Sequence, residues 1–155
     1  MRKRITTSLP DPASLPETQW LDLARIAQVE ITSEDANHPI ESALIAGSAG
    51  SGWKAGSSGE QTLRLLFDEP QKLKHIRLVF SENEYERTQE FVLAWSTDGL
   101  AYHDIVRQQY NFSPSTTEVE EYDVNLEGAK TLRLKIVPNI SGGETIASLT
   151  ELRVA

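Results

Sequence analysis

The sequence contains no cysteine in its 155 residues. A disulfide framework is therefore excluded, and so is a zinc or iron–sulfur site built on cysteine ligands. A chain of this length buries roughly 68–70% of its unfolded surface, so it can form a core without such cross-links. The lack of cysteine is compatible with a reducing compartment but does not require one.

The sequence also lacks a long apolar segment. No stretch approaches the run of about 18 apolar residues that a membrane helix needs. Charged residues occupy positions 2–4, but the segment that follows, Ile5–Pro10, is polar and ends in a proline, so it does not form the apolar region of a secretory signal. We therefore expect no membrane span, no secretory signal peptide and a cytoplasmic location.

Positive charge is scarce as well. The chain has 15 Lys and Arg residues against 23 Asp and Glu residues, which gives a formal net charge of −8. Because an acidic chain repels a phosphate backbone at long range, we expect no nucleic-acid partner. The basic run Arg2-Lys3-Arg4 is short and is interpreted as a solvated terminus.

Common catalytic motifs are missing. The three histidines, His38, His75 and His103, lie far apart, and neither a His-Glu-x-x-His nor a Gly-x-Ser-x-Gly motif occurs. His75 alternates outward on a predicted strand, which indicates a surface role. Glutamates at 82, 84 and 86 lie in a predicted loop, where such spacing fixes no separation across a glycosidic bond. We therefore predict that the chain is not an enzyme.

The main pattern that is present is an alternation of apolar and polar residues with a period of two. This alternation places side chains on opposite faces of half-buried strands. The predicted buried faces are Val29 and Ile31; Leu63, Leu65 and Phe67; Ile76, Leu78 and Phe80; Phe91, Leu93 and Trp95; Leu132, Leu134 and Ile136; and Leu152 and Val154. Turn residues occur at 68–70, 96–99, 128 and 141–143. Many short strands with regular turns and few helices predict an all-β sandwich or barrel.

The N-terminal residues follow a different pattern. We interpret residues 1–20 as an arm, because three prolines within 10–16 disfavour a long helix and favour extended chain. Trp20 and Leu21 are predicted to mark the point where the chain docks on the body of the protein. The rest of the chain, residues 21–155, is predicted to form a single domain.

Five short segments occur in a recognisable order from about residue 21 onward. They are Val29–Asp35; His38–Leu44 followed by Gly47 and Ser51-Gly52-Trp53; Gln61–Phe67 followed by Pro70; Trp95-Ser-Thr-Asp-Gly99 with Tyr102 after it; and Ala147–Leu152. In this order they resemble the motifs of the discoidin family, also called the coagulation factor V/VIII type C domain family, which includes family-32 carbohydrate-binding modules. The resemblance implies a galactose-binding-domain-like fold, a jelly-roll β-sandwich of about eight antiparallel strands.

The resemblance also raises the question of calcium. Many members of the family hold a structural calcium ion with carbonyls, an Asp and a hydroxyl of the glycine-rich loop and with the Glu of the last strand. Here Ala46 stands at the Asp position, while Ser51 and Glu151 remain as residual calcium-site candidates. Because calcium needs 6–8 hard oxygen ligands, losing the loop carboxylate disfavours the ion, and we expect no metal and no other cofactor. Glu151 should then have arginine or backbone partners, since a lone buried charge is costly.

Two polar and aromatic loops are the candidate ligand-binding segments, since the resemblance implies that ligands meet loops at one end of the sandwich. In the first, residues 81–87, Tyr85 offers an aromatic face and Arg87 a forked donor. In the second, residues 108–114, the candidates are Gln109, Tyr110, Asn111 and Phe112. The alternatives are a solvated hairpin with local salt bridges for the first loop, and a bulged strand with Tyr110 or Phe112 in the core for the second. Trp53 and Trp95 are expected in the core.

The functional prediction is a non-catalytic binding module, with carbohydrate as the expected ligand. The alternative is a cytoplasmic protein–protein interaction domain or assembly subunit. The alternative is motivated by the absence of a signal peptide and by the N-terminal arm, which could dock on a neighbouring protein. The sequence does not specify the ligand or the oligomeric state.

Overall fold

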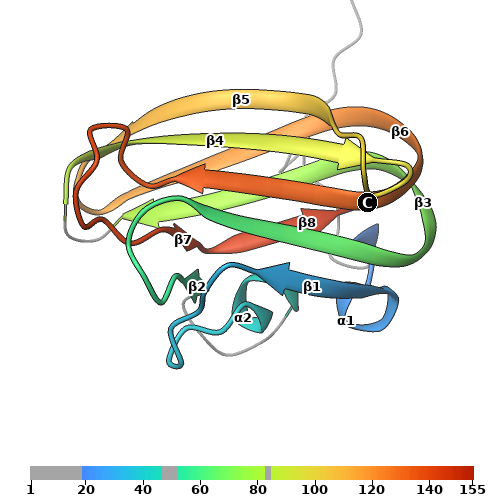
Figure 1. The fold of residues 1–155 in the computed structure, drawn as a ribbon, viewed down its shortest axis with the longest axis horizontal. Coiled ribbons are helices and arrows are strands. Elements are labelled where there is room, and N and C mark those ends of the chain that lie inside the picture. The colour runs from blue at the N-terminus through green and yellow to red at the C-terminus, as the bar shows by residue number, and fades with distance from the viewer. Residues whose placement is uncertain (1–18, 47–51, 83–84) are drawn as a thin grey trace, which may run out of the picture.

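A computed structural model describes residues 19–46, 52–82 and 85–155, so most of the predicted arm and Ser51 lie outside the described residues. The described chain contains two short helices and eight strands, all paired antiparallel (Figure 1). They are α1 (Leu23–Ile26), β1 (Ala27–Ile31), α2 (Glu41–Leu44), β2 (Trp53–Lys54), β3 (Gln61–Glu82), β4 (Arg87–Ser96), β5 (His103–Phe112), β6 (Thr116–Val137), β7 (Ser148–Leu149) and β8 (Glu151–Val154). Neither helix is long and apolar enough to cross a membrane.

The strands form two packed layers because β3 and β6 each run through both. The main sheet has the order β1-β3-β6-β4-β5, with β8 paired to β3, and β2 pairs with β7. The first half of β3 and the second half of β6 lie beside β1, β4 and β5, and their other halves lie with β8 in the second layer (Figure 1). The predicted antiparallel β-sandwich of about eight strands is confirmed.

The predicted turn at 68–70 is a bend inside β3 and does not end the strand. Residues 67–70 lie between the pairs Leu66–Thr131 and Gln71–Ala129, so they stand opposite residue 130 alone. Extra residues on one strand of a pair interrupt the ladder and increase its curvature. The bend carries β3 from one layer to the other, which the turn chemistry of the sequence does not reveal.

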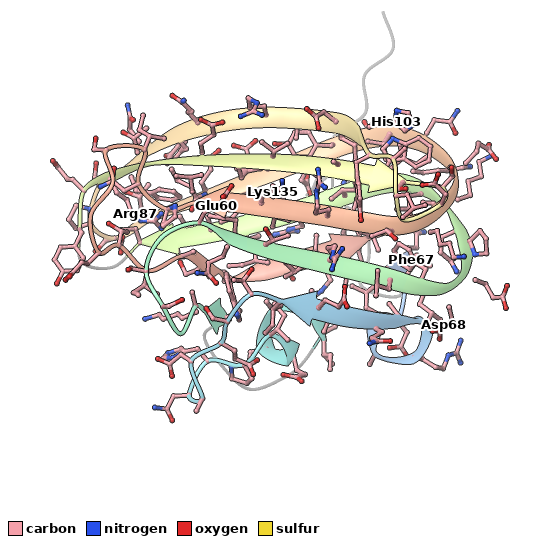
Figure 2. The ribbon with its side chains drawn as sticks, in the orientation of Figure 1. Glu60, Phe67, Asp68, Arg87, His103 and Lys135 are labelled. Carbon is pink, nitrogen blue, oxygen red and sulfur yellow. The ribbon has the colours of Figure 1, made fainter. Side chains whose placement is uncertain are left out.

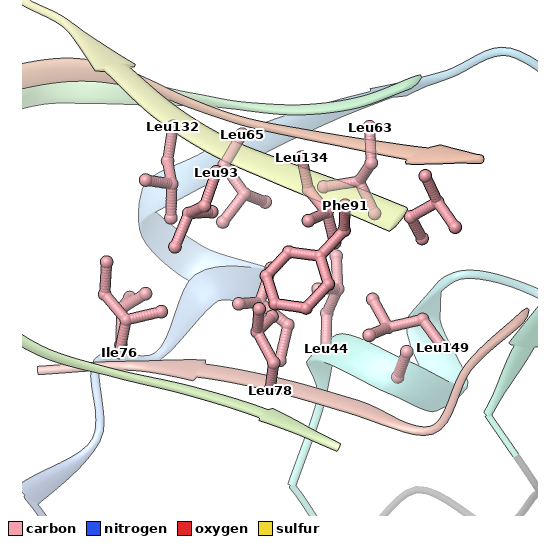
Figure 3. Packing of buried hydrophobic residues seen from close by; sticks show 14 of the residues in the cluster. Leu44, Leu63, Leu65, Ile76, Leu78, Phe91, Leu93, Leu132, Leu134 and Leu149 are labelled. Atoms are coloured by element: carbon pink, nitrogen blue, oxygen red, sulfur yellow. The ribbon is translucent and has the colours of Figure 1, made fainter. Parts of the chain in front are cut away.

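The core lies between the layers and contains most of the predicted alternating faces, whereas Val29 and Ile31 of β1 are half-buried and pack against it. Figure 3 shows side chains of β3, β4 and β6 from one layer meeting Ile76 and Leu78 from the other, with Phe91 between them. Of the predicted faces, those of β3, the second half of β6 and β8 are fully buried. Trp53 is buried as expected, and its Nε1 donates to the Ser33 carbonyl at 3.1 Å. Trp95 is half-buried and packs against the edge of the core.

The start of the described chain docks where the sequence predicted. The backbone N–H of Leu21 donates to the carbonyl of Val154 at 2.8 Å, and the Trp20 ring lies 5.6 Å from the His75 ring. This contact corrects the prediction that His75 has a surface role, because Trp20 covers the imidazole and leaves it only 5% exposed. The Nδ1 of His75 lies 2.8 Å from the Asp123 carboxylate.

The β4–β5 turn lies at one end of the sandwich, opposite the end where Arg87 lies (Figure 2). The backbone N–H groups of Leu100 and Ala101 and the hydroxyl of Ser96 all donate to the Asp98 carboxylate. These hydrogen bonds to the charged form lower the pKa of Asp98 to about 2. Gly99 has a φ of 78°, in the left-handed region that glycine adopts without strain. The predicted turn at 96–99 is thus confirmed.

Candidate functional site

A cleft of about 630 Å³ lies at the end of the sandwich where β3 ends and β4 begins. It is formed by segments that are far apart in the sequence: the chain after β1, the chain around β2, the end of β3, Tyr85 and the segment that leads into β7. The lining residues are Glu34, Asp35, Ala36, Lys54, Ala55, Gly56, Ser81, Glu82, Tyr85, Glu144, Thr145, Ile146 and Ser148. We call this feature the loop-end cleft.

Tyr85 supplies the aromatic surface of the loop-end cleft. The residue is 66% exposed, and it lines the cleft together with the exposed side chain of Ile146. An exposed tyrosine beside a polar cleft presents a flat apolar ring with a hydroxyl at its edge. The predicted ligand-binding residue Tyr85 therefore lies where it can contact a molecule in the cleft.

Two carboxylates of the loop-end cleft are held by local hydrogen bonds. Glu34 Oε1 accepts from the backbone N–H of Ile40 at 2.7 Å, and Asp35 Oδ1 accepts from the N–H of Asn37 at 2.8 Å. Such bonds fix acceptor oxygens in position before a ligand arrives, which reduces the ordering cost of binding. Among the described lining residues, Lys54 is the only basic one, so the cleft is predominantly acidic.

Arg87 corrects a sequence prediction, because it is not an exposed donor. Its side chain is 1% exposed, and its Nε donates to Glu82 at 2.7 Å. One terminal nitrogen donates to Gln89 Oε1 at 3.0 Å and to the Pro138 carbonyl at 2.9 Å. The guanidinium also lies 4.6 Å from the centre of the Phe112 ring. Arg87 begins β4 on its inward face and is committed to partners inside the protein.

The second predicted loop divides between the two faces of β5. Phe112 is buried at 2% exposure, and the half-buried Tyr110 meets its ring edge-on at 4.7 Å between centroids. Gln109 points to the outer face, where its Nε2 donates to Glu90 at 3.1 Å, and the exposed Asn111 accepts from the Thr88 hydroxyl at 2.6 Å. The alternative reading, a strand with a buried aromatic residue, is confirmed for Phe112.

The six predicted site residues are thus not gathered around one site. Tyr85 borders the loop-end cleft, whereas Arg87, Asn111 and Phe112 line a separate, shallower hollow of about 450 Å³. Gln109 and Tyr110 are among the lining residues of neither. Sequence reasoning missed the other walls of the cleft, which come from residues 34–36, 54–56 and 144–148. Some of these residues belong to segments that carry the family resemblance, such as Val29–Asp35 and Ala147–Leu152, but nothing in the sequence marked them as walls of a cleft.

A group of polar side chains faces inward at the side of the sandwich between β5 and β6. Glu120 pairs with Leu78 across the sheet, so it points to the same side as this core residue. Gln108 Nε2 donates to Glu120 at 2.7 Å, and the Tyr122 hydroxyl donates to Gln108 Oε1 at 2.7 Å. Burial and the neighbouring Glu118 raise the pKa of Glu120 to about 7.

This raised pKa predicts a pH-dependent effect of Glu120→Gln. The folded protein holds the Glu120 proton more tightly than the unfolded chain does, so the contribution of the protonated carboxyl to stability is complete below the unfolded pKa of 4.5 and is lost as pH rises through about 7. Because glutamine cannot ionise, the variant should be more stable than the parent by on the order of 1 kcal/mol at about pH 8, after allowance for solvent screening. Urea unfolding at about pH 8 and about pH 4 measures the difference.

Glu69→Gln is the matched control, because Glu69 is exposed on the bend of β3. Its effect should stay within about 0.5 kcal/mol at both pH values, as for ordinary surface substitutions. A Glu120→Gln effect of equal size at both pH values would contradict the assigned titration.

Among the described residues, Glu151, the carboxylate that the family resemblance assigns to calcium, is engaged by arginines. Ser51 lies outside the described residues. Both oxygens of Glu151 face guanidinium groups: Oε2 lies 3.3 Å from Arg77 Nε, and Oε1 lies 3.4 Å from a terminal nitrogen of Arg153. The expectation that Glu151 has arginine partners is confirmed. Among the described residues, no group of three or more His, Asp or Glu side chains is placed to hold a metal.

The fold and the site together define a small antiparallel β-sandwich with a polar cleft among the loops at one end. The F5/8 type C domain family matches residues 28–152, and the chain belongs to this family. The family predicted from the sequence is therefore confirmed. Among curated proteins no match was found.

Solved structures of family 32 carbohydrate-binding modules share this fold. The module of AlyQ in complex with 4,5-unsaturated mannuronic acid is 22% identical, with a TM-score of 0.60 over 84% of this chain and 95% of that chain. The Clostridium perfringens module CpGH89CBM32-5 in complex with GalNAc-β-1,3-galactose is 16% identical, with a TM-score of 0.62 over 88% and 99%. The family 32 module of NanJ from the same organism, in complex with galactose, is 17% identical, with a TM-score of 0.61 over 87% and 96%. At these identities the likeness shows that the fold is shared.

Proposed function

We propose that the chain is a non-catalytic carbohydrate-binding domain whose ligand sits in the loop-end cleft. The observation that carries the proposal is the exposed Tyr85 ring in the lining of a cleft that also offers carboxylates, hydroxyls and an ammonium group. Sugars present both an apolar face, which stacks on an aromatic ring, and hydroxyls, which need fixed polar partners. The cleft combines both kinds of surface.

The structural neighbours support the proposal at the level of ligand class. They are described in complex with galactose, with GalNAc-β-1,3-galactose and with 4,5-unsaturated mannuronic acid. Two of these ligands are neutral and one is acidic. These ligands therefore do not distinguish a neutral from an acidic sugar for this chain, and the side chains of its own cleft decide between them.

The charges of the cleft favour a neutral sugar. Four carboxylate residues line it, at positions 34, 35, 82 and 144, against the single ammonium of Lys54. Arg87 neutralises Glu82 but is buried behind it. A ligand carboxylate within about 4 Å of another carboxylate meets a repulsion of about 1 kcal/mol even at the dielectric of water, which is roughly a fivefold loss of affinity. We therefore propose neutral hexoses and their N-acetyl derivatives as ligands rather than uronic acids.

Replacing Tyr85 with alanine tests the site. Loss of the stacking surface should lower affinity for a bound sugar by about 10-fold or more, which corresponds to roughly 1.4 kcal/mol or more. The melting temperature should hardly change, because exposed substitutions usually shift stability by less than about 0.5 kcal/mol. Calorimetric titration of both proteins with galactose, N-acetylgalactosamine and galacturonate measures the affinities. Galactose and galacturonate differ at C6, so the pair also tests the charge argument.

Leu100→Ala is the control for this experiment. Leu100 is an exposed hydrophobic side chain in the β4–β5 turn, at the opposite end of the sandwich, and its loss should leave sugar binding unchanged. If none of the sugars binds the parent protein, carbohydrate binding is wrong. If galacturonate binds more tightly than galactose, the neutral class is wrong while carbohydrate binding stands.

A protein-interaction domain remains the competing hypothesis, and the exposed hydrophobic side chains bear on it. The large ones among the described residues are Tyr85, Leu100, Val119, Ile140 and Ile146. Two of them, Tyr85 and Ile146, already line the loop-end cleft, and the others come from the β4–β5 turn, β6 and the loop after β6. A protein interface usually needs a contiguous apolar patch, so these observations favour the cleft and a small ligand.

A further inference from the structure

Two arginines face each other across neighbouring strands on the outer face of the second layer. Arg77 of β3 and Arg153 of β8 are direct partners in the antiparallel register. Like charges in directly opposed positions are destabilising unless a counterion lies between them. Glu151 is that counterion, because it contacts Arg77 at 3.3 Å and Arg153 at 3.4 Å. Its carboxylate is therefore required to keep the two guanidinium groups together.

Arg153 also connects β8 to the short helix α2. One of its terminal nitrogens donates to the Ala43 carbonyl at 2.8 Å and to the Leu152 carbonyl at 3.0 Å. Ala43 lies in the last turn of α2, where carbonyls have no partner within the helix. Arg153 is only 7% exposed, so its hydrogen bonds to these carbonyls form in a largely dry environment. Arg153 thus binds both a carboxylate and a backbone carbonyl from a different segment.

A carboxylate and backbone carbonyls are the kinds of oxygen that a structural calcium ion would use. We infer that the Arg153 guanidinium supplies, within the chain, the positive charge that the family resemblance assigns to a structural calcium ion, so that this domain folds without calcium. The inference concerns the scaffold and is independent of the proposed carbohydrate ligand.

The local charge balance supports this inference. Glu151 already faces two cations, and Arg77 has a second carboxylate neighbour, Glu121, at 3.8 Å. A divalent ion at Glu151 would add two positive charges beside two guanidinium groups and would draw the carboxylate away from them. The two opposed arginines would then lose their shared counterion.

The first test compares thermal melts of the unaltered protein in EDTA and in about 5 mM calcium chloride, a concentration above the range of weak calcium sites. We expect melting temperatures that agree within about 1 °C, because an ion that binds neither state has no linkage to folding. Magnesium chloride at the same concentration controls for ionic strength. A rise of about 5 °C or more in calcium alone would overturn the inference.

The second test removes the guanidinium. Arg153→Met keeps much of the aliphatic volume but loses the bridge, and it should lower the melting temperature by about 5–10 °C. Arg64→Met is the matched control, because Arg64 pairs with Glu30 at 2.7 Å while both side chains are more than 40% exposed. The control should shift melting by less than about 2 °C. An Arg153→Met variant that melts like the control would overturn the bridging role, and one that fails to fold leaves the calcium comparison decisive.

Discussion

Replacing Arg87 with alanine is expected to lower the free energy of unfolding by about 3 kcal/mol or more, with a fall in melting temperature of roughly 6–12 °C. The guanidinium is buried, and three of its contacts are hydrogen bonds to the Glu82 carboxylate, the Gln89 amide and the Pro138 carbonyl. Alanine removes all three at once and also leaves a cavity beside the Phe112 ring. Removing one partner of a buried charge pair is among the most destabilising kinds of substitution. Denaturant unfolding and thermal melting measure the loss.

Arg107→Ala is the matched control for Arg87→Ala. Arg107 also forms an ion pair with a glutamate, Glu90, but its side chain is mostly exposed. Its loss should cost less than about 1 kcal/mol, because solvent screens exposed pairs. If the two variants lost equal stability, burial would not be the reason for the Arg87 effect.

Because Arg87 is buried, its substitution affects folding as well as any binding in the cleft. The sequence suggested that Arg87 is a forked donor to a ligand in an exposed loop. In the structure Arg87 supports the wall of the loop-end cleft through Glu82, which itself lines the cleft. An Arg87 variant that loses ligand affinity would therefore also have lost stability. Tyr85 is the residue whose substitution separates binding from folding.

The alternation of apolar residues predicted the buried faces of the strands because this signal is local. Leu63, Leu65 and Phe67 differ from their neighbours in polarity, and a strand sends such residues to one side. Arg87 and Gln89 point inward on β4, on the same side as Phe91. Because both are polar, the apolar alternation did not mark them as buried. Polar side chains that are buried with internal partners cannot be recognised by an apolar pattern.

The loop-end cleft could not be predicted as a whole because its walls meet only after folding. Lys54, Tyr85 and Ile146 are separated by dozens of residues and converge at one end of the sandwich. The family resemblance indicated that ligands meet loops at one end, and Tyr85 was found in this way. The residues around positions 35 and 145 carried no composition signal beyond that of an ordinary loop.

Phe112→Ala is expected to lower the free energy of unfolding by about 3–4 kcal/mol, which is typical of a large buried aromatic residue. Phe112 ends β5 inside the core cluster, where Tyr110 packs edge-on against its ring and the Arg87 guanidinium lies over it. Alanine would create a cavity and would remove the apolar surface on which the charge rests. Urea unfolding should show a lower midpoint with an unchanged slope, since the folded architecture persists.

The adjacent residue provides the control, because Asn111 lies on the opposite, exposed face of β5. Asn111→Ala should cost no more than about 1 kcal/mol, the contribution of its exposed hydrogen bond to Thr88. A double-mutant cycle with Phe112→Leu and Arg87→Lys measures the coupling between ring and guanidinium, which should be about 0.5–1.5 kcal/mol. If Phe112→Ala were as mild as Asn111→Ala, Phe112 would not be a core residue, and its predicted role as an exposed ligand contact would regain support.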